Sequence, residues 1–277
     1  MILLLVGAGC AAPALNPPVE STPGAAASTS TPLPTATASP LPSPTPVITP
    51  GAEPEAQLCS PLAGYPLDQL AGQVSNPYNP PPPGSDDPHH GSDLADFQPQ
   101  NRIARSGMAV QAVLSGRVAG VTRDRFPYGN LVIIETRLEE LPAALQARLN
   151  VPEMPAEPIR PLALSCPEYN IPENWRSAPR SLYLLYAHLL QPPAVQIGEQ
   201  VACGAPIGQI GESGNALAPH LHLEVRVGPG GVTLPSMAHY DDSARVDEMG
   251  AYCLWRVSGF FKTLDPFCLL SDCPEAP

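Results

Sequence analysis

Five of the six histidines in this chain fall in three short clusters, each with neighbours that suit metal or proton chemistry. Imidazoles and carboxylates bind metal ions and transfer protons near neutral pH. Their concentration predicts that the chain assembles a catalytic or metal-binding site. In chain order the clusters are His89-His90-Gly91-Ser92-Asp93, Tyr186-Ala187-His188 and His220-Leu221-His222-Leu223-Glu224.

The last cluster has the period of a β-strand. Successive side chains of a strand point to opposite faces, so His220, His222 and Glu224 share one face. Leu221 and Leu223 share the other face, which we expect to pack in a core. A lone histidine on a strand is usually a packing residue. Two histidines on one face beside an acid favour a functional site.

The first cluster is predicted to be extended. Pro88 before it and Gly91 within it disfavour a helix, so His89 and Asp93 can lie on one side of the segment. Gly91 places no side chain between them. We therefore expect the imidazole and the carboxylate to point toward a common centre.

Two histidines and one carboxylate are a standard ligand set for catalytic zinc, which keeps a fourth position open for water or substrate. The carboxylate candidate is Asp93. Spacing alone does not decide whether His89 or His90 is the ligand in the first cluster. It also leaves His220 and His222 as alternatives in the last cluster.

The elements that must position these clusters are short runs rich in Val, Ile, Leu and Tyr, bounded by Gly, Pro and Asn. This composition is typical of β-strands, so the prediction is a mainly β domain. Recurrent glycines between residues 198 and 214 predict tight turns, and a phosphate loop is excluded there because no GK[ST] follows. The expected strands are 109–114, 116–121, 131–136, 182–188 and 221–227.

Residues 137–180 interrupt the strand pattern. Leucines recur at near-helical spacing from Leu138 to Leu149, and Pro142 is suited to the first turn of a helix. A proline-rich stretch follows. We interpret the segment as an insertion between two neighbouring strands, with a short helix and a loop that Cys166 could staple. It could line a substrate groove, although a surface excursion is the commoner role.

The N-terminal part differs in composition from the rest. Residues 1–10 are an apolar run ending in Cys10 and resemble the end of a bacterial lipoprotein signal, although a chance cysteine is the alternative. Residues 11–57 are rich in Ala, Ser, Thr and Pro and predict a disordered tether. The apolar run is too short to span a bilayer. We expect a globular domain over 58–277 and membrane attachment only through a lipid on Cys10.

The charge of the chain excludes several partners. The formal net charge is -12 and Lys262 is the single lysine, which argues against nucleic acid and against adhesion to anionic lipid. The sequence does not indicate an oligomeric state.

Cysteine content predicts export. Besides Cys10 there are six cysteines, an even number that suits three disulfides in an oxidising compartment. A structural zinc site is less favoured because no CxxC pair occurs. Fifteen pairings are possible, and the sequence does not choose among Cys59, Cys166, Cys203, Cys253, Cys268 and Cys273.

Four motifs in order carry a family resemblance: HHGSDLAD, LYAHL, GEQVACGAPIGQIGESG and APHLHLEVR. They resemble the lysostaphin-type (LytM-like) zinc metallopeptidases, which cut the peptide part of peptidoglycan. The resemblance covers roughly residues 89–226, interrupted by 137–180, and continues weakly to 264–266. It implies a two-layer antiparallel β fold, a Zn²⁺ cofactor, a peptidoglycan peptide as substrate and a place in the cell envelope or on the cell surface.

The resemblance also assigns roles. The family motif HxGxD fits His89 and Asp93 and leaves His90 as the variable residue, while the second histidine of HxH, here His222, becomes the third zinc ligand. His188 and His220 become catalytic residues that do not bind the metal. Zinc would then activate a water, and these two histidines would orient it and exchange its proton. Ala218 replaces a usual glycine, which leaves groove shape and substrate choice open.

Several nearby residues have two interpretations. Asp96 and Glu224 are either hydrogen-bond partners of the ligand imidazoles or ordinary salt-bridge residues. Tyr186 either lines the groove or packs in the core, and Asn130 is expected in a turn. Ser213 is not expected to be a nucleophile, because GESGN does not match GxSxG.

Two further functions stay open. The same fold could serve a wall-binding or hydrolase-activating lipoprotein without catalysis. A zinc storage or sensory protein would need a closed site with four protein ligands, the fourth coming from His188 or His220. The complete set of five site residues favours the endopeptidase, and the bond it would cut is not indicated.

Overall fold

The computed structural model describes residues 57–168, 171–271 and 273. The chain divides into two units, Met1–Pro50 and Gly51–Pro277, and all described residues belong to the second. The signal-like segment with Cys10, and the expected tether up to residue 56, lie outside the described residues. Within the described part, no helix combines the length and apolar character that a membrane span requires.

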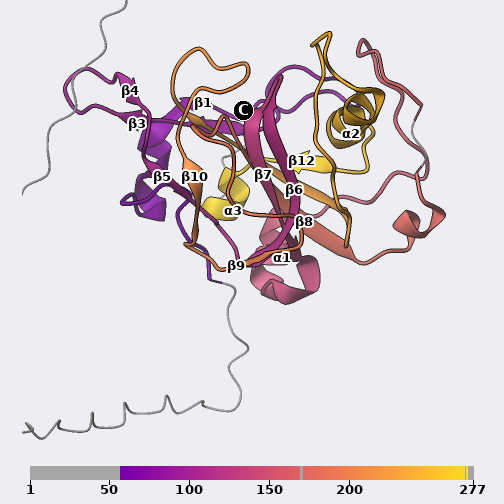
Figure 1. The fold of residues 1–277 in the computed structure, drawn as a ribbon. Coiled ribbons are helices and arrows are strands. Elements are labelled where there is room, and N and C mark those ends of the chain that lie inside the picture. The colour runs from indigo at the N-terminus through magenta and orange to yellow at the C-terminus, as the bar shows by residue number, and fades with distance from the viewer. Residues whose placement is uncertain (1–56, 169–170, 272, 274–277) are drawn as a thin grey trace, which may run out of the picture. The chain divides into compact units, whose positions relative to one another are not determined.

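An antiparallel sheet of eight strands forms the centre of the domain (Figure 1). Its order is β1-β2-β11-β8-β7-β6-β9, and β12 pairs with β11. The prediction of a mainly β, antiparallel fold is confirmed. The strands are β1 (Val74–Asn76), β2 (Ser92–Leu94), β6 (Gly116–Arg125), β7 (Gly129–Arg137), β8 (Arg180–Ala187), β9 (Gln200–Val201), β11 (Leu221–Pro229) and β12 (Lys262–Leu264).

Two small antiparallel sheets accompany the large one. β5 (Ala109–Gln111) pairs with β10 (Pro206–Gln209), and β3 (Asp96–Phe97) pairs with β4 (Ala104–Arg105). The run 109–114 was expected to be strand throughout, but β5 ends at Gln111. The backbone N–H of Val113 instead donates to the hydroxyl of Tyr186 at 2.9 Å. This N–H therefore bonds to a side chain in the core and not to a neighbouring strand.

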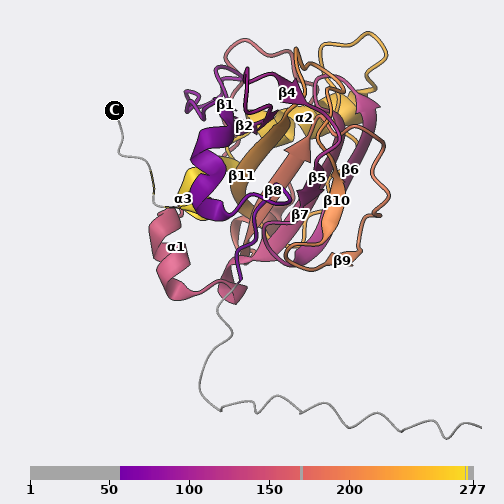
Figure 2. The same cartoon turned by 90° about the vertical axis from the view of Figure 1, so that its left-hand side faces the viewer.

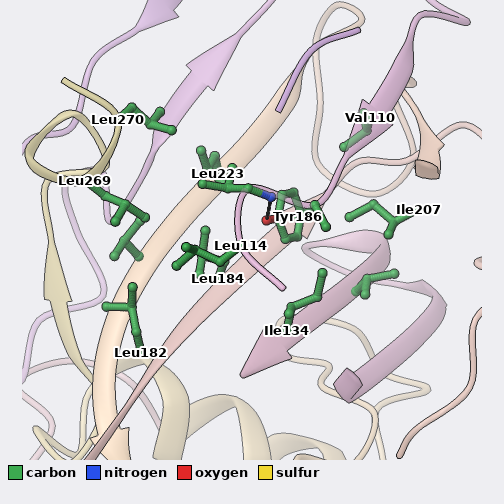
Figure 3. Close-up of a cluster of buried hydrophobic side chains, with 14 of the residues drawn as sticks. Val110, Leu114, Ile134, Leu182, Leu184, Tyr186, Ile207, Leu223, Leu269 and Leu270 are labelled. Atoms are coloured by element: carbon green, nitrogen blue, oxygen red, sulfur yellow. Dashed lines mark hydrogen bonds between the residues drawn. The ribbon is translucent and has the colours of Figure 1, made fainter. Parts of the chain in front are cut away.

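Both faces of the large sheet are buried. The leucines and valines of β11 belong to one hydrophobic cluster together with Leu182, Leu184 and Tyr186 of β8 (Figure 3). The alternate residues Tyr183, Leu185 and Ala187 belong to a second cluster with the helix α2 (Val246–Arg256). Strand alternation thus supplies two cores, one on each side of β8.

Short helices cover the first face. Leu70 of the 3-10 helix η1 (Leu67–Gln73) packs there, as do buried leucines of α1 (Ala143–Leu149) and α3 (Phe267–Leu270). Figure 2 shows α1 and α3 together on one side of the sheet. The second face is closed by α2 and by the aromatic residues that follow it.

The segment 137–180 connects β7 to β8, which are adjacent and antiparallel. It contains α1 and two 3-10 helices, η2 (Leu138–Glu140) and η3 (Glu173–Arg176). Pro142 was expected in the first turn of the helix, but it stands one residue earlier, as the N-cap of α1. A disulfide joins Cys166 to Cys253 of α2 and staples the loop to the second face.

The other four of these six cysteines also pair. Cys59 bonds with Cys203 and Cys268 bonds with Cys273. The first of these bridges joins residues 144 positions apart and fixes the start of the described domain next to the β9–β10 region. The three disulfides that cysteine counting predicted are therefore present in the structure.

Candidate functional site

Strand pairing brings the three histidine clusters together. His222, at the start of β11, lies opposite Asp93 of β2 on one side and Ala187 of β8 on the other. His188 directly follows β8. Three neighbouring strands thus present their functional residues at the same end of the sheet, although the clusters are far apart in the sequence.

Gly91 allows the close approach of β2 and β11. A Cβ at this position would lie 2.4 Å from the carbonyl oxygen of Leu223, a distance that real Cβ atoms do not show. From the sequence, we interpreted Gly91 as the residue that leaves space between the side chains of His89 and Asp93. The contact that requires glycine is instead with the backbone of the partner strand.

Three ligand atoms converge at the end of these strands. Asp93 Oδ1 lies 3.1 Å from His89 Nε2 and 2.8 Å from His222 Nδ1, and the two nitrogens lie 3.2 Å apart. Two ligands of a tetrahedral zinc ion with bonds of about 2.0–2.1 Å are roughly 3.3 Å apart. The donor types and their separations therefore fit a zinc ion.

The tautomers of the two imidazoles also fit a cation. His89 Nδ1 lies 2.8 Å from the carbonyl of Pro77, which can only accept, so Nδ1 carries the proton. His222 Nε2 donates to the Glu224 carboxylate at 3.1 Å. The lone pairs of His89 Nε2 and His222 Nδ1 then face one another. A metal ion or a proton must lie between them to offset their repulsion.

His188 and His220 stand beside these three donors. The His188 Nδ1 atom donates to the carbonyl of Ser213 and the His220 Nδ1 atom donates to that of Ala218, both at 2.8 Å. Each ring therefore has its lone pair on Nε2. The His220 Nε2 atom is 3.6 Å from Asp93 Oδ1. The ring centroids of His188 and His220 are 4.7 Å apart. The structure thus gathers all five predicted site residues.

A small hydrogen-bond network holds His188. The backbone of His188 is left-handed, with φ 60°. Ser213 Oγ donates to the carbonyl of Leu189 and accepts from the backbone of Asn130, whose side chain also donates to Leu189. Ser213 therefore supports the loop instead of acting as a nucleophile. Asn130 was expected in a turn, but it is buried within β7, where it supports the same loop as Ser213.

Glu224 is fully buried beneath α2 and is the partner of a ligand imidazole. The polar face of β11 is therefore shielded from solvent, except near His222, which lines the groove. Burial alone would raise the pKa of Glu224, but nearby arginines and its hydrogen bond with His222 hold that pKa well below the ordinary value. Its donors are His222 Nε2, the Tyr128 hydroxyl, Trp255 Nε1, Arg226 Nε and Arg256 Nη1.

Other candidates take structural roles. The partners of Asp96 among the described residues are the Tyr65 hydroxyl and Arg105, so of its two alternative roles the structure supports the salt bridge. Tyr186 is buried in the core. His90 is buried on the far side of the segment, where its Nδ1 accepts from Arg226 Nη2 at 2.7 Å.

The buried charges shift the proton affinities of the cluster. Burial alone would raise the pKa of Asp93, but the adjacent imidazoles of His222 and His89 hold it well below its ordinary range. Burial alone would lower the pKa of His222, but Asp93 and Glu224 raise it to about 9. Burial and the neighbouring His222 and His220 lower the pKa of His188 to about 3. His188 is therefore neutral at pH 7.

All five residues line one groove of about 730 Å³. The sequence did not identify its other polar members, because none of them belongs to a recognised motif and several come from segments remote from the clusters. Asn76 donates to Asp93 Oδ2 at 3.2 Å, and the remaining wall includes Asp86, Asp87, Tyr128, Tyr240, Tyr252 and Arg256. The lining residues include none from 137–180, so the insertion braces α2 and does not form the groove wall.

A second hollow of about 400 Å³ lies at the opposite end of β6, β7 and β8. It is lined by residues such as Arg117, Glu135 and Ser181 and contains none of the predicted site residues. Arg117 and Glu135 form an ion pair there. The five predicted site residues therefore all lie in the larger groove.

Comparison with known proteins gives a family match over residues 177–234, to the model for Peptidase family M23. This segment includes His188, His220 and His222. The first cluster and α2 lie outside it.

Solved structures of several peptidases are similar to this chain. An M23 protein of Pseudomonas aeruginosa is 17% identical with a TM-score of 0.37, over 80% of this chain and 54% of that one. The catalytic domain of the antimicrobial peptidase lysostaphin from Staphylococcus simulans is 20% identical with a TM-score of 0.33, over 58% of this chain and 85% of that one. A zinc-containing peptidase of Vibrio cholerae is 21% identical with a TM-score of 0.30, over 55% of this chain and 32% of that one. The chain spans about half the length of the Pseudomonas protein.

Proposed function

We propose that this protein is a zinc-dependent endopeptidase that hydrolyses peptide bonds in peptidoglycan cross-links or stem peptides. The observation that carries the proposal is the convergence of His89 Nε2, Asp93 Oδ1 and His222 Nδ1, with the two imidazole lone pairs facing one another. Asp93 and His222 come from the paired strands β2 and β11, His89 comes from the segment just before β2, and all three line a groove large enough for a peptide. The M23 match over residues 177–234 supports a peptidase.

The metal would be held by His89, Asp93 and His222, the group whose ligand atoms lie within 4.8 Å of one another. A zinc ion bound by three protein ligands lowers the pKa of a coordinated water from 15.7 to about 7 and polarises the scissile carbonyl. Asp93 is kept as an anion by its neighbours, and Pro77 and Glu224 fix the ring orientations of the two ligand histidines.

His188 and His220 are proposed to handle the proton. Their lone pairs are on Nε2, because both Nδ1 atoms donate to backbone carbonyls. One imidazole accepts a proton from the attacking water and then delivers it to the amine that leaves. Once protonated, the ring also stabilises the developing oxyanion. The two rings stand together, with centroids 4.7 Å apart, so they can share this work on one substrate.

The environment of the protein is proposed to be the cell envelope or the cell surface. Three disulfides suit an oxidising compartment. Attachment through a lipid on Cys10, with residues 11–57 as a tether that reaches toward the wall, completes the proposal. Metabolic labelling with a fatty acid should mark Cys10 in the wild type and not in a Cys10→Ser variant. A wild type without label would contradict the anchor.

The test of the enzyme proposal is direct. The purified oxidised chain should bind one zinc ion and release amines from peptidoglycan, and His89→Ala or Asp93→Ala should abolish both. Mass analysis of the released fragments would identify the bond. A wild type that binds zinc stoichiometrically but cleaves neither wall preparations nor cross-linked peptides would favour the wall-binding alternative. Spectra of the cobalt-substituted protein that show four protein ligands would favour the storage alternative.

A further inference from the structure

Arg256 is the last residue of α2 and lies outside both the M23 match and the three histidine clusters. Its side chain is only 10% exposed, yet it reaches two different parts of the groove. Nη1 donates to Glu224 Oε1 at 3.0 Å and to the Tyr128 hydroxyl at 3.2 Å. Nε and Nη2 donate to Asp86, to Oδ1 at 2.5 Å and to the carbonyl at 2.8 Å.

The contact with Glu224 connects Arg256 to the proposed metal site. The Oε1 atom that accepts from Arg256 also accepts from His222 Nε2. The guanidinium therefore fixes the carboxylate oxygen that sets the orientation and tautomer of the ligand ring. Outer partners of metal-binding histidines usually contribute 10–100-fold to metal affinity.

The contact with Asp86 connects the same guanidinium to the wall of the groove. Asp86 Oδ2 accepts from the hydroxyls of Tyr240 at 2.7 Å and Tyr252 at 2.9 Å. Asp86 and Asp87 line the groove and come just before His89 in the chain. Since Tyr240 is 60% exposed at the rim, Arg256 anchors the loop that a bound substrate would touch.

We propose that Arg256 is a positioning residue that serves both halves of the site. Through Glu224 it orients His222 for zinc, and through Asp86 it holds the 85–88 loop and Tyr240 in place for substrate. A planar guanidinium suits this role, because its fixed fork of donors can satisfy separate acceptors at one time, which a lysine ammonium on a single stem cannot do in the same geometry. The inference rests on the proposed zinc peptidase.

The test separates the two halves. Arg256→Met should weaken zinc binding 10–100-fold, measured by chelator competition on the metal-free chain, and should also raise KM for a cross-linked wall peptide that the wild type cleaves. Glu224→Gln should reproduce mainly the loss of zinc affinity, and Asp86→Asn mainly the rise in KM. Because Arg256 acts on zinc through Glu224, the double variant Arg256→Met, Glu224→Gln should bind zinc no more weakly than the worse single variant.

A matched control is another arginine that pairs with α2. Arg125, the last residue of β6, forms an ion pair with the buried Glu248 near the start of α2, at 2.7 Å. Arg125→Met should lower the melting temperature without changing zinc affinity or KM. If Arg256→Met behaves like this control, Arg256 is only a structural anchor and the proposal is overturned. Additive losses in the double variant would overturn it equally.

Two further outcomes are decisive. If Arg256→Met does not fold, Arg256→Lys should still weaken zinc binding by at least about threefold, and wild-type affinity in that variant would refute the role. A wild type that binds no zinc would remove the proposed function and this inference together. A wild type that binds zinc while the Arg256 variants bind it equally well removes the inference alone.

Discussion

His89 Nε2 and His222 Nδ1 face each other at 3.2 Å, and each ring donates its opposite N–H to a fixed acceptor. Neither nitrogen can donate to the other while both rings are neutral, so a proton or a metal ion must lie between them. Asp93 Oδ1 completes the cluster on the same side. The pair is therefore organised for a cation before any substrate arrives.

The first prediction concerns zinc and stability. Zinc bound to the native state should stabilise it by about 4 kcal/mol at a free concentration of 1,000 Kd, and differential scanning calorimetry with and without chelator should show the higher melting temperature. His89→Ala should lose this gain. His239→Gln is the control, because His239 is buried elsewhere against the carbonyl of Ser165. An equal gain in both variants would show that zinc binds at another place.

The second prediction follows from the pKa of His222, which its neighbours raise to about 9 in the metal-free protein. At pH 7 this ring is protonated, so zinc must displace its proton. Apparent zinc affinity should rise about tenfold per pH unit up to about pH 9, and calorimetry in buffers of different ionisation enthalpy should detect roughly one proton released at His222. Affinity that stays constant between pH 6 and pH 8 would contradict the raised pKa.

The same shift affects the stability of the metal-free protein. The folded pKa of His222 lies above its ordinary value of 6.5, so its contribution to stability is complete below pH 6.5 and is lost as the pH rises toward 9. His188 affects the stability in the opposite direction. Its folded pKa of about 3 lies below the ordinary value of 6.5, so the unfolded state takes up a proton first and the stability falls as the pH drops below 6.5. Chemical denaturation of the His222→Ala variant should therefore lack the decline between pH 6.5 and pH 9.

The third prediction separates catalysis from metal binding. His188 lies outside the three converging donors, and Ser213 fixes its tautomer. His188→Ala should bind zinc as the wild type does but lose about 10²–10⁴-fold in kcat. Zinc content by mass spectrometry and turnover of a cleavable wall peptide give the two readouts. Loss of zinc in this variant would make His188 a ligand and favour a closed site.

Much of this site could be predicted from local pattern. The period of β11 placed His222 and Glu224 on one face, and their 3.1 Å contact agrees with it. The strand runs of β6, β7, β8 and β11 also followed from β-branched and aromatic content. Local periodicity suffices there because each residue's neighbours belong to the same element.

The remainder depends on contacts between distant segments. Arg256 and Asp86 are separated by 170 positions, and only the packing of α2 against the sheet brings them together. The burial of the polar face of β11 was missed for the same reason, since nothing in the strand itself shows that α2 covers it. The reason for Gly91 lies likewise in Leu223 of the partner strand.

The fourth prediction uses that glycine. In Gly91→Ala the new Cβ would meet the carbonyl oxygen of Leu223 at 2.4 Å and its carbonyl carbon at 3.0 Å, both of them backbone atoms that cannot rotate away. The strands must separate, which moves Asp93 away from His222. We expect a loss of roughly 2 kcal/mol or more in the free energy of unfolding, together with zinc affinity weakened at least about tenfold.

Gly72→Ala is the matched control for this substitution, because no atom lies within 4 Å of a Cβ placed there. It should leave zinc affinity within error of the wild type and leave the midpoint of denaturation equal to that of the wild type or slightly higher. Both variants remove a glycine from the unfolded chain, so a change seen only in Gly91→Ala reports the contact between β2 and β11. Zinc affinity equal to the wild type in Gly91→Ala would mean that β2 can shift without moving Asp93, and that the register of these two strands does not set the metal site.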